Sequence, residues 1–316
     1  MILLVWVPLL TPFLAAPAAR RVAAGLPPRR AVWLLTGVAL TLAGSSSAAL
    51  ALLVVPGASY LPAVAVLGEL VEPLTAGPPA VTIALASVAG ALLAGVVGSL
   101  GAALRRDLTW LRRAGAAHGG TDGELAVVRD AVPDAYALPG RPGRIVVTTG
   151  MLRALEPAER EALFAHERAH LRGRHHLFLL AAEAAARCHP ALRALREPLG
   201  YALERDADET AAAAVGDRRL AARAIGRAAL AARRSRTAAP VRPGSVPAAT
   251  AGPVPRRVAA LLDADAATRP VLPGAGRLVA GVLLLCLLVS GATAVGAADD
   301  LHAHIEIAQG EAAAPR

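Results

Sequence analysis

The sequence contains no lysine, so arginine supplies all 33 residues of the Lys+Arg class. This absence excludes the lysine of a P-loop nucleotide site, a Schiff base with a substrate, and a serine–lysine nucleophile pair. Cysteine is also scarce, and the only two, Cys188 and Cys286, are expected in different surroundings and predict no disulfide framework. The sequence carries no helix-turn-helix or RNA-binding signature and no internal repeat of fixed period.

Charged residues are missing from four long stretches, and this uneven distribution indicates membrane spans. With 55% hydrophobic residues, the 316-residue chain is too apolar for a soluble protein of this size. A transmembrane helix needs about 20 mainly apolar residues, and each stretch reaches or approaches this length. The predicted spans cover residues 1–19, 31–55, 81–104 and 277–298.

The first of these stretches has two interpretations. Ala16-Pro17-Ala18 would suit the cleavage site of a secretory signal peptide. In a signal peptide the positive charge precedes the apolar region, whereas here Arg20 and Arg21 follow it. We therefore favour a retained span with the N-terminus outside.

Arginines near the ends of the spans predict the orientation of the chain through the positive-inside rule. Residues 56–80 contain two glutamates but no basic residue, which places this loop outside the cell. The arginines that mark the cytoplasmic side are Arg20, Arg21, Arg29, Arg30, Arg105, Arg106, Arg112, Arg113 and Arg277. The net charge of +9 lies almost wholly in the large loop of residues 105–276, and it indicates contact with the lipid bilayer rather than direct binding of nucleic acid.

The large loop is expected to begin with a small sheet and to become helical after Gly150. Apolar runs at residues 125–128, 136–138 and 145–149 are separated by turns that contain proline and glycine, so they predict short strands. Residues 176–186 are apolar and form either a buried core helix or a segment that dips into the membrane.

This pattern divides the chain into five parts. The membrane region with three spans covers residues 1–104, and a folded cytoplasmic domain covers residues 105–234. A linker rich in proline and alanine follows at residues 235–276, and it contains a short helix at 256–263. The fourth span covers residues 277–298, and a short extracytoplasmic tail covers residues 299–316.

The most specific motif of the sequence is HExxH at residues 166–170, within the helical part of the loop. Residues four apart lie on one face of a helix, so His166 and His170 can direct their imidazoles at one metal ion. Glu167 is placed to accept a proton from a water molecule that the metal activates. The alternative is a solvated helix that carries these side chains without a metal.

A second helical segment supplies acidic side chains for a third ligand. Glu204 and Asp208 are four residues apart and share a face, so one can bind zinc while the other bonds the far nitrogen of a ligating histidine. A charged, solvated helix is the alternative. His175 and His176 also follow the motif, but a five-residue step from His170 turns away from the metal face. We therefore expect these two histidines at the surface or at an interface.

The combination of HExxH, the pattern E-x-x-A-D at residues 204–208, and the segments 135–140 and 144–149 resembles membrane-embedded zinc metallopeptidases. The resemblance covers roughly residues 1–300. The most similar group is the BlaR/MecR-type antirepressors, and the HtpX/Ste24-type proteases are the nearer relatives outside it. The chain departs from the β-lactam-responsive members, because it has no S-x-x-K motif and only residues 299–316 follow the last predicted span. A penicillin-binding sensor domain is therefore not expected.

The resemblance assigns a role to each candidate residue of the site. It implies that His166, His170 and Glu204 bind one Zn²⁺ per chain, that Glu167 is the general base, and that Asp208 is the carboxylate behind a ligating histidine. It also implies that Ile145, Val146, Val147 and Thr148 form an edge strand to which a peptide substrate adds as a further strand. The alternative is an ordinary internal strand.

The expected fold is an α-helical polytopic membrane protein with a mainly α, zincin-like domain and a small sheet. The expected function is that of a zinc endopeptidase of the bacterial inner membrane, with its protease domain in the cytoplasm, that cleaves a winged-helix repressor in regulated proteolysis. One alternative is quality control of membrane proteins, as in HtpX-type enzymes. Another is a membrane signalling protein that keeps its zinc for structure and does not catalyse.

Overall fold

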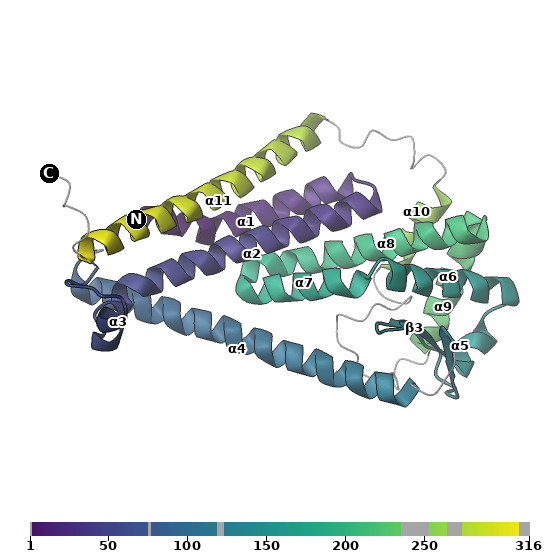
Figure 1. Cartoon of the computed structure of the whole chain (residues 1–316). Coiled ribbons are helices and arrows are strands. Elements are labelled where there is room, and N and C mark those ends of the chain that lie inside the picture. The colour runs from purple at the N-terminus through teal and green to yellow at the C-terminus, as the bar shows by residue number, and fades with distance from the viewer. Residues whose placement is uncertain (1, 75–76, 119–122, 235–252, 264–273, 310–316) are drawn as a thin grey trace.

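A computed structural model describes residues 2–74, 77–118, 123–234, 253–263 and 274–309 of the chain. Long helices form an elongated bundle, and a smaller part with helices and a sheet lies partly beside it and partly beyond one end of it (Figure 1). Most of the predicted linker of residues 235–276 lies outside the described residues, so its flexibility stays a prediction.

The bundle consists of α1 (Ile2–Ala24), α2 (Pro28–Ala58), the short α3 (Pro62–Leu67), α4 (Pro79–His118) and α11 (Gly274–Ala308). The smaller part consists of β1 (Leu125–Val128), β2 (Ala135–Leu138), β3 (Arg144–Thr148), α5 (Thr149–Ala154), α6 (Pro157–Arg172), α7 (His175–Cys188), the 3₁₀ helix η1 (Pro190–Leu195), α8 (Arg196–Val215), α9 (Arg218–Arg234) and α10 (Val254–Leu262). The three predicted strands and the short helix near residues 256–263 are therefore present.

Three helices are long and apolar enough to cross a bilayer, over Pro28–Ala58, Pro79–Ala117 and Gly276–Ala308. They correspond to α2, α4 and α11. Among the described residues, α1 is not one of the helices found long and apolar enough to cross a bilayer. It is a single helix that packs against α2 and α11. The fourth span and the side of the membrane on which the site lies stay predictions.

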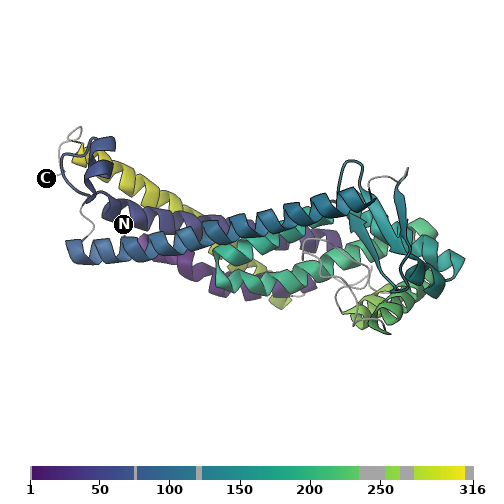
Figure 2. The same cartoon turned by 90° about the horizontal axis from the view of Figure 1, so that it is seen from below.

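The helix α4 extends well beyond a membrane span. Its 40 residues correspond to a length of about 60 Å, whereas the hydrocarbon core of a bilayer is about 30 Å thick. Near its C-terminal end, Trp110 and Leu111 pack against Ala126 and Val146 of the sheet. Figure 2 shows α4 running along the molecule to the sheet. One helix therefore joins the predicted membrane region to the small sheet.

The sheet has the strand order β1-β3-β2, with β3 parallel to β1 and antiparallel to β2. The prediction that residues 145–148 form an edge strand open to a substrate is therefore wrong, because β3 is paired on both sides. Ile145 to Thr148 are all buried, since one face of the sheet packs on α4 and the other on α5, α6 and α9. An apolar strand that is covered on both faces is typical of the centre of a sheet.

The hairpin formed by α7, η1 and α8 packs along the membrane helices and shares one core with α1 and α2. Phe178 of α7 makes an edge-to-face contact with Trp33 of α2, at 5.1 Å between ring centroids. At the tip of the hairpin, Nε2 of His189 lies 3.0 Å from the carbonyl oxygen of Leu9. This contact fixes the tip of the hairpin, from which α8 with the acidic motif follows, against α1.

Candidate metal centre

The HExxH helix α6 begins with a well-formed cap. The backbone N–H of Glu156 donates to the carboxylate of Glu159 at 3.0 Å, the side chain of Glu156 caps the backbone in return, and Pro157 occupies the first turn. Arg227 of α9 also donates to Glu159, at 2.9 Å. These contacts fix the start of α6, so that its buried face points at α8.

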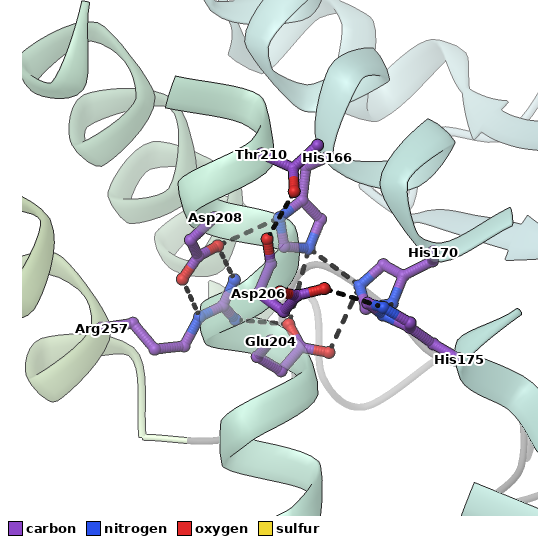
Figure 3. A network of polar contacts seen from close by, with 8 residues as sticks. All are labelled: His166, His170, His175, Glu204, Asp206, Asp208, Thr210 and Arg257. Atoms are coloured by element: carbon purple, nitrogen blue, oxygen red, sulfur yellow. Dashed lines mark hydrogen bonds and ion pairs between the residues drawn. The ribbon is translucent and has the colours of Figure 1, made fainter. Parts of the chain in front are cut away.

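His166, His170 and Glu204 each bring one ligand atom to a common point between α6 and α8 (Figure 3). Nε2 of His166 lies 3.1 Å from Nε2 of His170, and the two nitrogens lie 3.5 and 3.6 Å from the two carboxylate oxygens of Glu204. Ligand atoms about 2.0–2.1 Å from a tetrahedral zinc ion are roughly 3.3 Å apart. The residues present therefore fit a metal ion, and two imidazoles with one carboxylate are a donor set that zinc accepts.

Asp208 supports the first histidine from behind. Its Oδ1 lies 3.0 Å from Nδ1 of His166, the nitrogen that faces away from the common point. This contact holds the imidazole in place and keeps Nε2 available for a metal, as carboxylates behind ligating histidines do. Burial acts to raise the pKa of Asp208, but its hydrogen bonds to Arg257 and His166 outweigh burial and lower that pKa. Asp208 therefore stays charged.

The pKa values of His166 and His170 are shifted in opposite directions. Burial acts to lower the pKa of His166, but hydrogen bonds to Asp208 and Glu204 outweigh it and raise that pKa to about 9. Burial and the neighbouring positive charges of His166 and Arg257 lower the pKa of His170 well below its usual range. In the metal-free protein His166 thus carries a proton at neutral pH, and a metal ion that binds Nε2 must displace it.

A third histidine supports His170, and the sequence interpretation missed it. Nδ1 of His175 lies 2.8 Å from Nδ1 of His170, and Nε2 of His175 lies 3.3 Å from the carboxylate of Asp206. If a metal occupied Nε2 of His170, Nδ1–H of His170 would donate a hydrogen bond to Nδ1 of His175, and Nε2–H of His175 would donate one to Asp206. Of the two positions expected for His175, the surface is excluded, because this side chain is buried between α6 and α8.

The five-residue spacing does not describe the position of His175, because helical spacing applies only within one helix and His170 and His175 belong to different helices. α6 ends at Arg172, and Arg174 has a φ of 50°, in the left-handed region. α7 then starts at His175 in a new direction, which returns its imidazole to the site. The only signal in the sequence is the glycine at position 173 between two arginines, which is compatible with a helix end.

Arg257 of α10 is the second residue that the sequence interpretation did not find. Its guanidinium donates to both carboxylate oxygens of Asp208, at 2.8 and 2.6 Å, and lies 2.8 Å from Glu204 (Figure 3). The side chain is fully buried. Burial acts to lower the pKa of Arg257, but Glu204, Asp208 and Glu167 outweigh it and raise that pKa. Arg257 thus holds two acidic residues in fixed positions.

The predicted site residues fall into two groups in the structure. His166, Glu167, His170, Glu204 and Asp208 are all buried at the interface of α6 and α8. The residues of β3 lie apart, because Val147 packs with Met151 and Leu163 in a core cluster rather than with the ligands.

Residues 105–195 match the model of Peptidase family M48. The match includes HExxH of α6 and ends before Glu204, so the third ligand atom is placed by the structure alone. It covers less than a third of the chain and indicates a metallopeptidase, a class of enzyme that depends on a metal ion. No curated protein and no solved structure matches the chain.

Proposed function

We propose that this chain is a membrane-bound zinc endopeptidase. The observation that carries the proposal is the convergence of His166, His170 and Glu204 within a buried group, with Glu167 next to His166 on the same helix. The match to a metallopeptidase family over the HExxH segment supports the same activity. The three apolar helices support a membrane location.

Zinc held by His166, His170 and Glu204 would supply a Lewis acid that polarises the scissile carbonyl group and lowers the pKa of a water molecule. Glu167 accepts the proton of that water at its carboxylate and later returns a proton to the leaving amine. Asp208 and His175 orient the two ligating histidines, and Arg257 holds the carboxylates of Glu204 and Asp208 in place. The three ligand residues are at most 4% exposed, so a peptide reaches them only when the covering residues, among them Arg257 of α10, separate.

For the substrate we retain the cytoplasmic repressor as the first candidate. One observation favours the second candidate, quality control of membrane proteins: the helices that bear and flank the site, α7 and α8, share a core with α1 and α2. A site in this position is close to segments that emerge from the bilayer. A repressor gene beside this one would favour the first candidate, and induction by membrane stress would favour the second.

Glu167→Gln tests the activity, because it removes the base and leaves the ligands in place. Detergent-solubilised wild type and variant are compared for zinc content and for cleavage of a neighbouring repressor and of a misfolded membrane protein. Zinc near one per chain in both, with cleavage by the wild type alone, supports the hydrolytic mechanism. Zinc in both without cleavage by either would favour the structural role of zinc in a non-catalytic signalling protein. No zinc in either would contradict the site.

A further inference from the structure

A cavity of about 600 Å³ lies where the end of α1 and the start of α2 meet α8 and α10. Four arginines contribute to its lining, against one acidic residue, Glu197. These arginines are Arg20, Arg21, Arg205 and Arg256. The cavity is separate from the metal centre, since none of the proposed zinc ligands lines it. Its volume is within the range of about 300–1,000 Å³ that is usual for sites of small ligands.

Most of this positive charge is not neutralised within the part of the chain that the structure describes. There, no carboxylate forms an ion pair with Arg20, Arg21 or Arg256. Arg205 is paired with Glu209 at 3.2 Å, but its buried Nε has no hydrogen-bond partner among the described residues. Like charges around one cavity repel one another, and an anion with several oxygen atoms relieves this repulsion and accepts their hydrogen bonds.

The walls and the position of the cavity indicate where such an anion comes from. Pro17, Ala24, Leu26 and Pro28 give it an apolar side at the ends of two neighbouring helices of the bundle. α2 is one of the helices that can cross a bilayer, and the cavity lies at its N-terminal end. Headgroups of lipids lie at the ends of membrane spans, and basic pockets between such helices bind anionic headgroups.

We propose that this cavity binds the phosphate group of an anionic phospholipid headgroup, with Arg20, Arg21 and Arg256 as its principal donors. Arg256 is held in place by Tyr201, whose ring centroid lies 4.8 Å from the guanidinium carbon. The apolar side accepts the glycerol and the first carbons of the acyl chains. Inorganic phosphate offers the same oxygen atoms to the arginines as the headgroup does, but it has no apolar group that can pack against the apolar side of the cavity.

The bound headgroup connects the metal centre to the membrane helices. Arg256 lines the cavity, whereas the next residue of α10, Arg257, contacts Glu204 and Asp208. A phosphate between α1 and Arg256 therefore holds α10 in the position in which Arg257 reaches the acidic residues. Anionic lipid is expected to raise the melting temperature of the protein, because it binds the folded state only.

The test uses the full-length protein in a neutral detergent and does not depend on peptidase activity. Its affinity is measured for short-chain phosphatidylglycerol, short-chain phosphatidylcholine and inorganic phosphate. Phosphatidylglycerol is expected to bind saturably and at least about tenfold more tightly than the other two. Arg20→Gln with Arg21→Gln is expected to weaken the binding of phosphatidylglycerol roughly 25-fold, about fivefold for each arginine.

The matched control is Arg105→Gln with Arg106→Gln, which removes two exposed arginines of α4 that lie outside the cavity. It is expected to change the affinity less than about twofold, and an equal loss in both double variants would overturn the proposal in favour of diffuse attraction. Equal affinity for phosphatidylcholine, or for inorganic phosphate, would overturn the assignment to an anionic lipid. If the arginine variant does not fold, Ala24→Leu is the alternative test, because a larger side chain at this position fills part of the cavity without a change of charge. Unchanged binding of phosphatidylglycerol by this variant would contradict the site.

Discussion

Nδ1 of His170 lies 2.8 Å from Nδ1 of His175, although the two residues belong to different helices. Because Nε2–H of His175 donates to Asp206, Nδ1 of His170 is the donor in this contact, and the contact sets the tautomer of both rings. It directs the lone pair of Nε2 of His170 towards Glu204 and His166, where the proposed zinc ion binds. The turn between α6 and α7 is therefore part of the metal centre.

His175→Phe is expected to weaken zinc binding about 10- to 100-fold, the usual effect when a group behind a ligating histidine is lost. The ring is retained, so that the core stays filled, but the acceptor for Nδ1 of His170 is removed. Competition with a chromophoric chelator measures the dissociation constant. His176→Phe changes the adjacent, half-buried histidine and is the control. Equal losses of affinity in the two variants would contradict the role of His175.

Gly173→Ala is expected to lower both the melting temperature and the affinity for zinc. A Cβ at this position would lie 2.4 Å from Nε2 of His175 and 3.0 Å from the carbonyl oxygen of Ala169, so the imidazole must move. Gly226→Ala in α9 is the matched control, because a Cβ there meets nothing within 4 Å. The control is expected to stabilise the protein by up to about 1 kcal/mol, since alanine favours a helix more than glycine. Similar melting temperatures for the two variants would show that the turn tolerates the methyl group.

Arg257→Ala is expected to destabilise the metal-free protein by about 3–5 kcal/mol, because it removes one of the two cations that face the buried carboxylates of Glu204 and Asp208 and leaves protonated His166 alone against both. Arg196→Ala removes a pair with Glu183 at the surface, where the arginine side chain is 49% exposed. This control is expected to cost at most about 1 kcal/mol. Thermal unfolding in detergent measures both changes. An Arg257 variant as stable as the control would mean that the carboxylates find other partners.

The stabilisation of the protein by zinc is expected to increase as the pH rises from about 6.5 to 9. The pKa of His166 is raised from 6.5 to about 9 in the metal-free folded protein. Its proton therefore stabilises that state fully below pH 6.5, and this contribution is lost as the pH rises through about 9. Zinc competes with the same proton, so its affinity increases over this interval. The difference in melting temperature with and without zinc, measured across the interval, checks the sign, and a constant difference would contradict it.

Local spacing in the sequence was sufficient for the pairs that share a helix. His166 with His170, and Glu204 with Asp208, are each four residues apart, and the geometry of an α-helix places such residues on one face whatever the rest of the fold does. The three strands and the apolar helices were predictable for the same reason, because turn residues and uninterrupted apolar runs are also local signals.

The tertiary structure alone decided how these local elements meet. It placed β3 at the centre of the sheet rather than at its edge, since strand order depends on pairing between distant segments. The left-handed residue Arg174 turned the chain so that His175 entered the site. Arg257 joined it from a position 49 residues beyond Asp208 in the sequence. Periodicity describes neighbours along one helix, whereas contacts between helices follow from packing and burial, which no local pattern encodes.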